Sequence, residues 1–237
     1  MKHIFRFLGT RSDEGWNLRE EDIHHLVKVV HAKVGDRFEI CDQNGWVAQA
    51  TIVERQKKDL VFKILSENFE EAAKQSVTLF CAACKPGVFD EALPSAIELD
   101  VSRIFVFAQD KGELKKLNDK VLARWQRISD EAMKQSKRRY VAPIEVCADF
   151  ESALKLSSPS DFSHLWMLDE MQNDQILDSR ISSGSVALLV GSEYGLSHET
   201  RATAEAAGFK SVRMARNVLK AKTAIISALA ITGKALM

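Results

Sequence analysis

The sequence has little of what marks several protein classes. Four cysteines among 237 residues, at positions 41, 81, 84 and 147, do not form the dense, evenly spaced set of a disulfide-rich secreted domain. The longest nearly apolar stretch, AIISALAIT, is roughly half the length of a membrane-spanning helix. Arg6 interrupts the few apolar residues at the N-terminus, where a signal peptide would need a continuous apolar run. We therefore expect a reduced, soluble, cytoplasmic protein without membrane association.

The chain also has no formal net charge at pH 7, because its 33 basic residues balance its 33 acidic residues. This balance argues against a strongly basic, non-specific nucleic-acid binder. The charges are nevertheless uneven: residues 115–139 hold nine Lys or Arg against three acids, and residues 161–199 hold seven acids against one arginine. Neither Gly-x-Gly-x-x-Gly nor Gly-x-x-x-x-Gly-Lys-Ser/Thr is present, which disfavours a dinucleotide oxidoreductase or a P-loop enzyme. A polyanion bound at one chosen basic face remains favoured.

Residues 1 to about 70 predict a small β-rich unit. Asn44-Gly45 lies between two β-prone runs in RFEICDQNGWVAQATIVER and predicts a hairpin with positive φ at both central residues. LVFKIL at 60–65 predicts a further strand, and IHHLVKVVHAK at 23–33 predicts a short helix. The acid-rich ENFEEAAKQS at 67–76 changes the composition and is the best candidate for a linker.

From Ser76 onward, short apolar runs alternate with helical patterns, which predicts an α/β domain with a parallel sheet. Apolar residues recur every three or four positions over 117–136 and predict one amphipathic helix. Pro94 lies inside a second expected helix, 88–99, and weakens that prediction. Ligands of open α/β sheets bind at the carboxyl ends of the strands. The expected strands are SVTLFCAAC, RIFVFA, PIEVC, HLWML and SVALLV.

Three segments could carry chemistry. In VALLVGSEYGLSHET, an apolar strand runs into a glycine-flanked turn that is either a pocket floor or an ordinary strand-to-helix connection. The basic run Lys134–Tyr140 either stabilises a helix C-terminus or contacts phosphates. Cys81 and Cys84 have the spacing of a redox pair, but two buried small hydrophobic residues explain them better, and no second cysteine pair completes a metal site.

Three separated stretches resemble the bacterial small-subunit ribosomal RNA uridine-N3 methyltransferases, the RsmE family of the SPOUT superfamily. The helix end RWQRISDEAMKQSKRRYVAPI is similar to that family's helix ending in Glu-Gln-Ser-Gly-Arg. LLVGSEYGLS is similar to Leu-Leu-Ile-Gly-Pro-Glu-Gly-Gly-Leu-Ser, and MARNVLKAKTA to Leu-Gly-x-Arg-Ile-Leu-Arg-x-Glu-Thr-Ala. The order and spacing of the three fit the family over nearly the whole chain.

The resemblance implies a PUA-like RNA-binding β-barrel at 1–70, followed at 71–237 by a SPOUT methyltransferase domain with a trefoil knot. It implies a homodimer that binds S-adenosylmethionine and methylates uridine N3 in small-subunit (16S) ribosomal RNA, without a metal. Its motifs assign catalysis to Glu193 and Asn217 and RNA binding to Gln135, Ser136, Arg138 and Arg139. They assign cofactor binding to Leu189, Val190, Gly191, Gly195, Met214, Val218 and Leu219.

The chain departs from the family motifs at several loop positions, as a divergent member would. Asn217 replaces an arginine, and Tyr194 puts a ring where the motif has its second glycine. A rival interpretation is therefore a catalytically silent relative that binds RNA as a ribosome assembly factor. A Cys-x-x-Cys redox protein is a remote third. The other departures are Ser192 for Pro, Ala215 for Gly, Lys220 for the second Arg and Lys222 for Glu.

Overall fold

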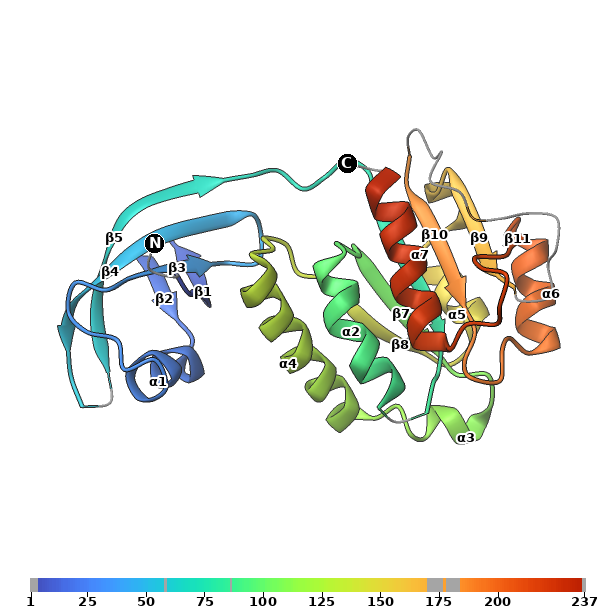
Figure 1. Ribbon diagram of the computed structural model, residues 1–237, viewed down its shortest axis with the longest axis horizontal. Helices are drawn as coiled ribbons and strands as arrows, with labels where there is room; N and C mark the ends of the chain where they lie inside the picture. The colour runs from blue at the N-terminus through green and yellow to red at the C-terminus, as the bar shows by residue number, and fades with distance from the viewer. Residues whose placement is uncertain (1–3, 58, 86, 170–176, 178–183, 236–237) are drawn as a thin grey trace. The chain divides into compact units, whose positions relative to one another are not determined.

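The computed structural model describes residues 4–57, 59–85, 87–169, 177 and 184–235 (Figure 1). The chain forms two compact units. The first contains residues 1–72 together with 133–141, and the second contains 73–132 and 142–237. Within the described part, no helix combines the length and the apolar character that crossing a bilayer requires.

The first unit is a five-stranded sheet in the order β2-β1-β3-β4-β5, in which β1 and β3 are parallel and the other pairs antiparallel. The two edge strands, β2 and β5, contact each other through a side-chain hydrogen bond. Nε1 of Trp16 in β2 donates to the carboxylate of Glu67 in β5 at 2.8 Å. Phe38 and Ile40 are buried at the centre. The elements are β1 (Arg6–Ser12), β2 (Gly15–Leu18), α1 (Glu20–Lys28), β3 (Arg37–Cys41), β4 (Trp46–Arg55) and β5 (Leu60–Phe69).

The expected hairpin joins β3 to β4, but its turn differs from the prediction. Positive φ falls on Gln43 (65°) and Gly45 (101°), not on Asn44. The loop has four residues instead of two, and Asp42 Oδ1 accepts from the backbone N–H groups of Asn44 at 2.8 Å and Trp46 at 3.0 Å. The side chain of Asp42 therefore organises the turn, as aspartates commonly do.

Two element boundaries were wrong in the sequence prediction. The helix expected at 23–33 is α1, which begins at Glu20, because three acids favour its N-terminal turn. It ends before His31, whose φ of 52° is incompatible with a continuing helix. The expected linker at 67–76 begins inside β5, which continues to Phe69 because it pairs with β4 as far as Trp46.

The second unit contains a six-stranded sheet in the order β11-β9-β10-β6-β7-β8, with every neighbouring pair parallel. The α/β prediction and its five strands are confirmed. The two central strands, β6 and β10, are buried along their whole length. The chain order changes direction between them, so the loops after β6 and β10 meet at one edge. The strands are β6 (Val77–Ala82), β7 (Arg103–Phe107), β8 (Ile144–Cys147), β9 (His164–Leu168), β10 (Val186–Val190) and β11 (Lys210–Val212).

Helices cover both faces of this sheet (Figure 1). On one face, α2 packs against α7, and α7 contacts β6 and β10. On the other face, α5 packs in a hydrophobic core that contains Phe80 and Phe105. Pro94 lies inside α2, where one missing N–H is tolerated within a helix that buries its apolar face. The helices are α2 (Val88–Glu98), α3 (Lys111–Leu114), α4 (Asp119–Ser136), α5 (Phe150–Leu156), α6 (His198–Ala206) and α7 (Ala221–Ala235).

Candidate active site

Two loops far apart in the sequence line one cavity of about 100 Å³ at the carboxyl ends of β9, β10 and β11. One loop is Gly191–Gly195, after β10, and the other is Met214–Leu219, after β11. The structure therefore brings together most of the residues assigned to cofactor binding and catalysis. Those that line the cavity are Val190, Gly191, Gly195, Met214, Asn217 and Leu219.

The loop after β10 is a closed turn that requires glycine at both ends. The backbone N–H of Ser192 donates to the Gly195 oxygen at 3.2 Å, and the Gly195 N–H donates back to the Ser192 oxygen at 3.0 Å. Gly195 has a φ of +78°, and a Cβ on Gly191 would lie 2.6 Å from the Gly195 carbonyl carbon. No side chain fits at Gly191 without moving the turn.

Gln109, at the end of β7, fixes this loop in place. Its Nε2 donates to the Gly195 oxygen at 3.1 Å, and its Oε1 accepts the Ser197 N–H at 2.6 Å. Ser197 then caps α6, since its Oγ accepts the Thr200 N–H at 3.1 Å. The sequence motifs did not single out Gln109. The available signal was a polar residue directly after an apolar strand, at the edge where ligands bind.

The cavity wall combines apolar and charged side chains. Val190, Leu196 and Leu219 give it an apolar surface. Asp169 and Arg201 also line it and form an ion pair with each other. The sequence motifs had not singled out this pair. An apolar surface beside opposite charges is suited to a ligand with a flat ring system and a zwitterionic end.

Three of the assigned residues lie elsewhere. Leu189 is fully buried in the sheet core, and Val218 is 71% exposed and does not line the cavity. Glu193 faces a different cavity, and both its carboxylate oxygens accept the backbone N–H of Lys85, at 3.0 and 3.1 Å. The geometry of Glu193 is that of a loop anchor.

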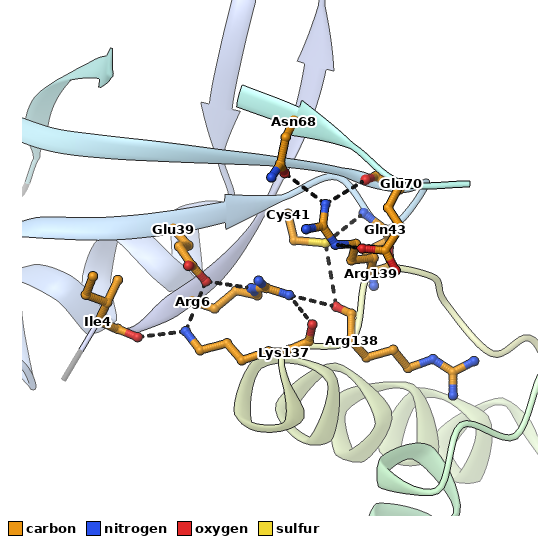
Figure 2. Close-up of polar contacts among 11 residues, drawn as sticks. Ile4, Arg6, Glu39, Cys41, Gln43, Asn68, Glu70, Lys137, Arg138 and Arg139 are labelled. Atoms are coloured by element: carbon orange, nitrogen blue, oxygen red, sulfur yellow. Dashed lines mark hydrogen bonds and ion pairs between the residues drawn. The ribbon is translucent and has the colours of Figure 1, made fainter. Parts of the chain in front are cut away.

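The basic run at the end of α4 is held within the first unit (Figure 2). Lys134 forms an ion pair with the buried Asp22 at 3.0 Å. Arg139 pairs with Glu70 at 3.0 Å and donates to Asn68 at 2.9 Å. These contacts give the run a structural role. Of the four residues assigned to RNA binding, Gln135 is exposed, and Ser136, Arg138 and Arg139 are partly buried.

The segment that directly follows α4 is held by the buried Arg6 (Figure 2). Its guanidinium donates to the carbonyl oxygens of Lys137 and Arg138 and to Glu39, the last at 3.0 Å. Lys137 also pairs with Glu39, at 3.1 Å. Burial by itself would raise the pKa of Glu39, but the hydrogen bond from Lys137 and the charge of Arg6 outweigh it, so that pKa lies below its ordinary value.

The thiol of Cys81 is not in the environment of a reactive cysteine. Cys81 is fully buried in β6, and both the neighbouring Cys84 and burial raise the pKa of its thiol well above the ordinary value. A redox-active cysteine needs the opposite shift, toward the thiolate. The prediction of two buried small hydrophobic residues agrees with this geometry for Cys81 but is wrong for Cys84, which is only partly buried and lines a cavity.

Comparisons with known proteins match both units. The RNA methyltransferase domain family matches residues 70–233, and the PUA domain of RNA methyltransferases matches residues 18–65. The chain is 28% identical, over 218 residues, to the ribosomal RNA small subunit methyltransferase E of Synechocystis, covering 90% of this chain and 71% of that protein. It is 24% identical to the protein of the same name from Mesomycoplasma hyopneumoniae, covering 94% and 96%.

Solved structures show the same fold. The crystal structure of a ribosomal RNA small subunit methyltransferase E from Neisseria gonorrhoeae, bound to S-adenosylmethionine, superposes with a TM-score of 0.80 at 24% identity, covering 96% of each chain. A methyltransferase of Legionella pneumophila in complex with the same cofactor has a TM-score of 0.80 at 20% identity, covering 97% and 96%.

Proposed function

Because this chain belongs to the RNA methyltransferase family, we propose that it transfers a methyl group from S-adenosylmethionine to N3 of a uridine in small-subunit ribosomal RNA. The observation that carries the proposal is the cavity shared by the loops after β10 and β11. The family match supports the resemblance drawn from the sequence motifs, and the PUA match supports an RNA-binding role for the first unit. The names of the relatives supply the substrate class.

The residues of the cavity fit the cofactor. Leu219 and Leu196 offer apolar surface to an adenine ring, and the glycine turn brings bare backbone groups to the wall. Asp169 and Arg201 offer charges complementary to the ammonium and carboxylate of a methionine moiety. When bound, the cofactor supplies the reactive methyl group, and the protein contributes positioning and exclusion of water.

Uridine N3 carries a proton at neutral pH, so the site must also help to remove it. Asn217 lines the cavity and has an amide that can donate to and accept from the base edge. We assign it the role of orienting the uridine, in place of the arginine of the family motif. Glu193 anchors the loop after β10 and affects the position of the uridine only indirectly, by holding that loop in place.

Two further parts of the proposal concern the path of the chain and the oligomeric state. The last segment, from β11 to α7, threads through the domain as a trefoil knot, which would explain why its loop reaches the cavity beside the loop after β10. The protein acts as a homodimer. Sedimentation of the purified chain at its working concentration tests the second statement, and a monomer would contradict it.

The decisive experiment maps methylated nucleotides in ribosomal RNA from cells that lack the protein. We expect one N3-methyluridine to disappear from the small subunit and to return with the parent gene. The rival, a catalytically silent assembly factor, rests on the replaced residues Tyr194 and Asn217. Calorimetry with S-adenosylmethionine separates the two, because no binding at millimolar cofactor together with an unchanged methylation profile would favour the silent relative.

A further inference from the structure

A second cavity lies beside the first, across the loop after β10. Its volume is about 190 Å³, and its wall combines that loop with the turn after β6, α2 and α4. Ser192 and Gly195 line the first cavity, whereas Glu193 and Tyr194, the residues between them, line the second. One short loop thus separates this cavity from the cofactor site proposed above. A ligand in the second cavity would therefore lie beside the cavity to which the cofactor is assigned above.

Tyr194 gives this cavity an exposed aromatic ring. Its side chain is 78% exposed, the highest value among the large hydrophobic side chains in the described part of the chain. The Lys85 ammonium lies 4.9 Å from the centre of the ring. The hydrogen bond with Tyr194 is the main cause of a raised pKa at Lys85, which keeps that ammonium charged. A bare ring beside a cation offers stacking and phosphate contact at one point.

The acidic side chains of the cavity are engaged by donors of the protein itself. Glu193 and Glu113 each accept a backbone N–H, the latter at 2.7 Å. Asp90 accepts the indole N–H of Trp125 at 2.7 Å and pairs with Arg124. These contacts partly neutralise the negative charge of the three acids, so the cavity can accept an anionic ligand.

A stripe of exposed basic residues leads away from the cavity along α4. Three of its members are in α4 at spacings of four and three positions, so they lie on one face of the helix, and the fourth lies in the turn before it. The opposite face carries the buried Trp125. We call this set the basic stripe: Lys116, Lys120, Arg124 and Arg127. Lys116 and Arg124 also line the cavity, so stripe and cavity are continuous.

From these observations we propose that the second cavity binds a nucleotide of the RNA substrate adjacent to the target uridine. Its base stacks on Tyr194, and the phosphates that follow lie along the basic stripe. The proposal rests on the proposed function, because RNA is the polyanion that function brings to this loop. The stripe favours RNA over a protein partner, since an ordered row of cations matches the regular spacing of a nucleic-acid backbone.

The test uses small ribosomal subunits from cells that lack the protein, and compares the parent protein with Tyr194→Phe, Tyr194→Ala and, as an exposed control in the other loop, Val218→Ala. Two quantities are measured: equilibrium binding to the subunit and the KM and kcat of methyl transfer. We expect Tyr194→Ala to weaken binding and raise KM about tenfold or more. Tyr194→Phe keeps the ring and should behave as the parent does, as should Val218→Ala, with cofactor affinity unchanged in all three.

The stripe is tested by the double variant Lys120→Ala/Arg127→Ala. Each lost phosphate contact should reduce the slope of log K against log salt by about 0.7–0.9. Equal subunit binding by the parent, Tyr194→Ala and the stripe variant would overturn the proposal, as would binding by none of them. Conversion of a dimer to a monomer by Tyr194→Ala would show a protein interface instead. If the parent transfers no methyl group but its binding depends on Tyr194, the proposed function fails and this inference stands.

Discussion

Glu193 and Lys85 join the two central loops of the sheet, because both carboxylate oxygens of Glu193 accept the Lys85 backbone N–H, at 3.0 and 3.1 Å. The contact ties the loop after β10 to the turn after β6. It satisfies a backbone donor that would otherwise need water. It also fixes the loop that forms a wall of both cavities.

Substitutions of Glu193 distinguish a role in anchoring the loop after β10 from a role as the base that removes the uridine N3 proton. Glu193→Gln keeps an amide oxygen that accepts the Lys85 N–H, so we expect kcat to stay within about tenfold of the parent value. Glu193→Ala leaves that exposed donor to water, so it should cost only about 0.5–1.5 kcal/mol in unfolding free energy, and it should weaken cofactor binding because the loop loses its anchor. The measurements are kcat against pH, calorimetry with S-adenosylmethionine and thermal unfolding. A collapse of kcat in Glu193→Gln, with cofactor affinity and stability intact, would make Glu193 the catalytic base.

The sequence predicted the sheet well, because β6 and β10 are buried on both faces and therefore read as continuous apolar runs. It could not place single side chains in the loops. Val218 and Leu219 are adjacent and equally apolar, yet one is exposed and the other lines the cavity. That difference depends on the path of the turn, which no periodicity encodes. The basic run at 134–139 was ambiguous because its partners, such as Asp22 and Glu70, are distant in sequence.

The adjacent pair Val218 and Leu219 provides a matched test of the cofactor cavity. Leu219→Ala removes apolar surface from the cavity wall and should weaken S-adenosylmethionine binding about tenfold or more. Val218→Ala removes a side chain that is 71% exposed and should change the affinity little. Calorimetric titration of both variants with S-adenosylmethionine measures the two affinities. Equal losses would mean that the turn closes over the ligand with Val218 inside.

The glycine turn after β10 provides another test of the cofactor cavity. In Gly191→Ala the new Cβ would lie 2.6 Å from the Gly195 carbonyl carbon, so the turn must open. We expect a loss of about 1–3 kcal/mol in unfolding free energy and no detectable cofactor binding. Gly233→Ala, within α7, is the control: its Cβ would meet the backbone oxygen of Leu99, at the end of α2, at 3.4 Å, which is van der Waals contact. That variant should bind the cofactor as the parent does. A Gly191→Ala protein with parental affinity would show that the cofactor site lies elsewhere.

The thiols of Cys81 and Cys84 should be dispensable for activity. The hydrogen bond with the neighbouring Cys84 and burial raise the pKa of Cys81 well above its ordinary value, so little thiolate forms at neutral pH. The double variant Cys81→Ala/Cys84→Ala should keep kcat and lose only a modest part of the unfolding free energy, because one small buried group and one partly buried group are removed. Methyl-transfer assays and thermal unfolding measure both. Abolished activity in a folded double variant would revive the redox interpretation.

The cluster of Arg6, Glu39 and Lys137 predicts how the first unit responds to acid. The pKa of Glu39 is lower in the folded protein than its ordinary value of 4.5, because the hydrogen bond from Lys137 and the charge of Arg6 exceed the cost of burial. The native state therefore favours the ionised carboxylate. Its contribution to stability is complete above the unfolded pKa and disappears as the pH falls through the folded pKa.

Glu39→Gln removes this pH-dependent contribution while keeping the size of the side chain. We expect the variant to be less stable than the parent at pH 7, because Arg6 would then be buried beside a neutral group. Below pH 4.5 the difference should shrink, since the parent also loses the charge as Glu39 takes up a proton. Unfolding of both proteins across pH 3–7 measures the difference directly. A gap between parent and variant that stays constant over that range would show that the carboxylate charge contributes nothing and that packing alone holds the end of α4 against the sheet.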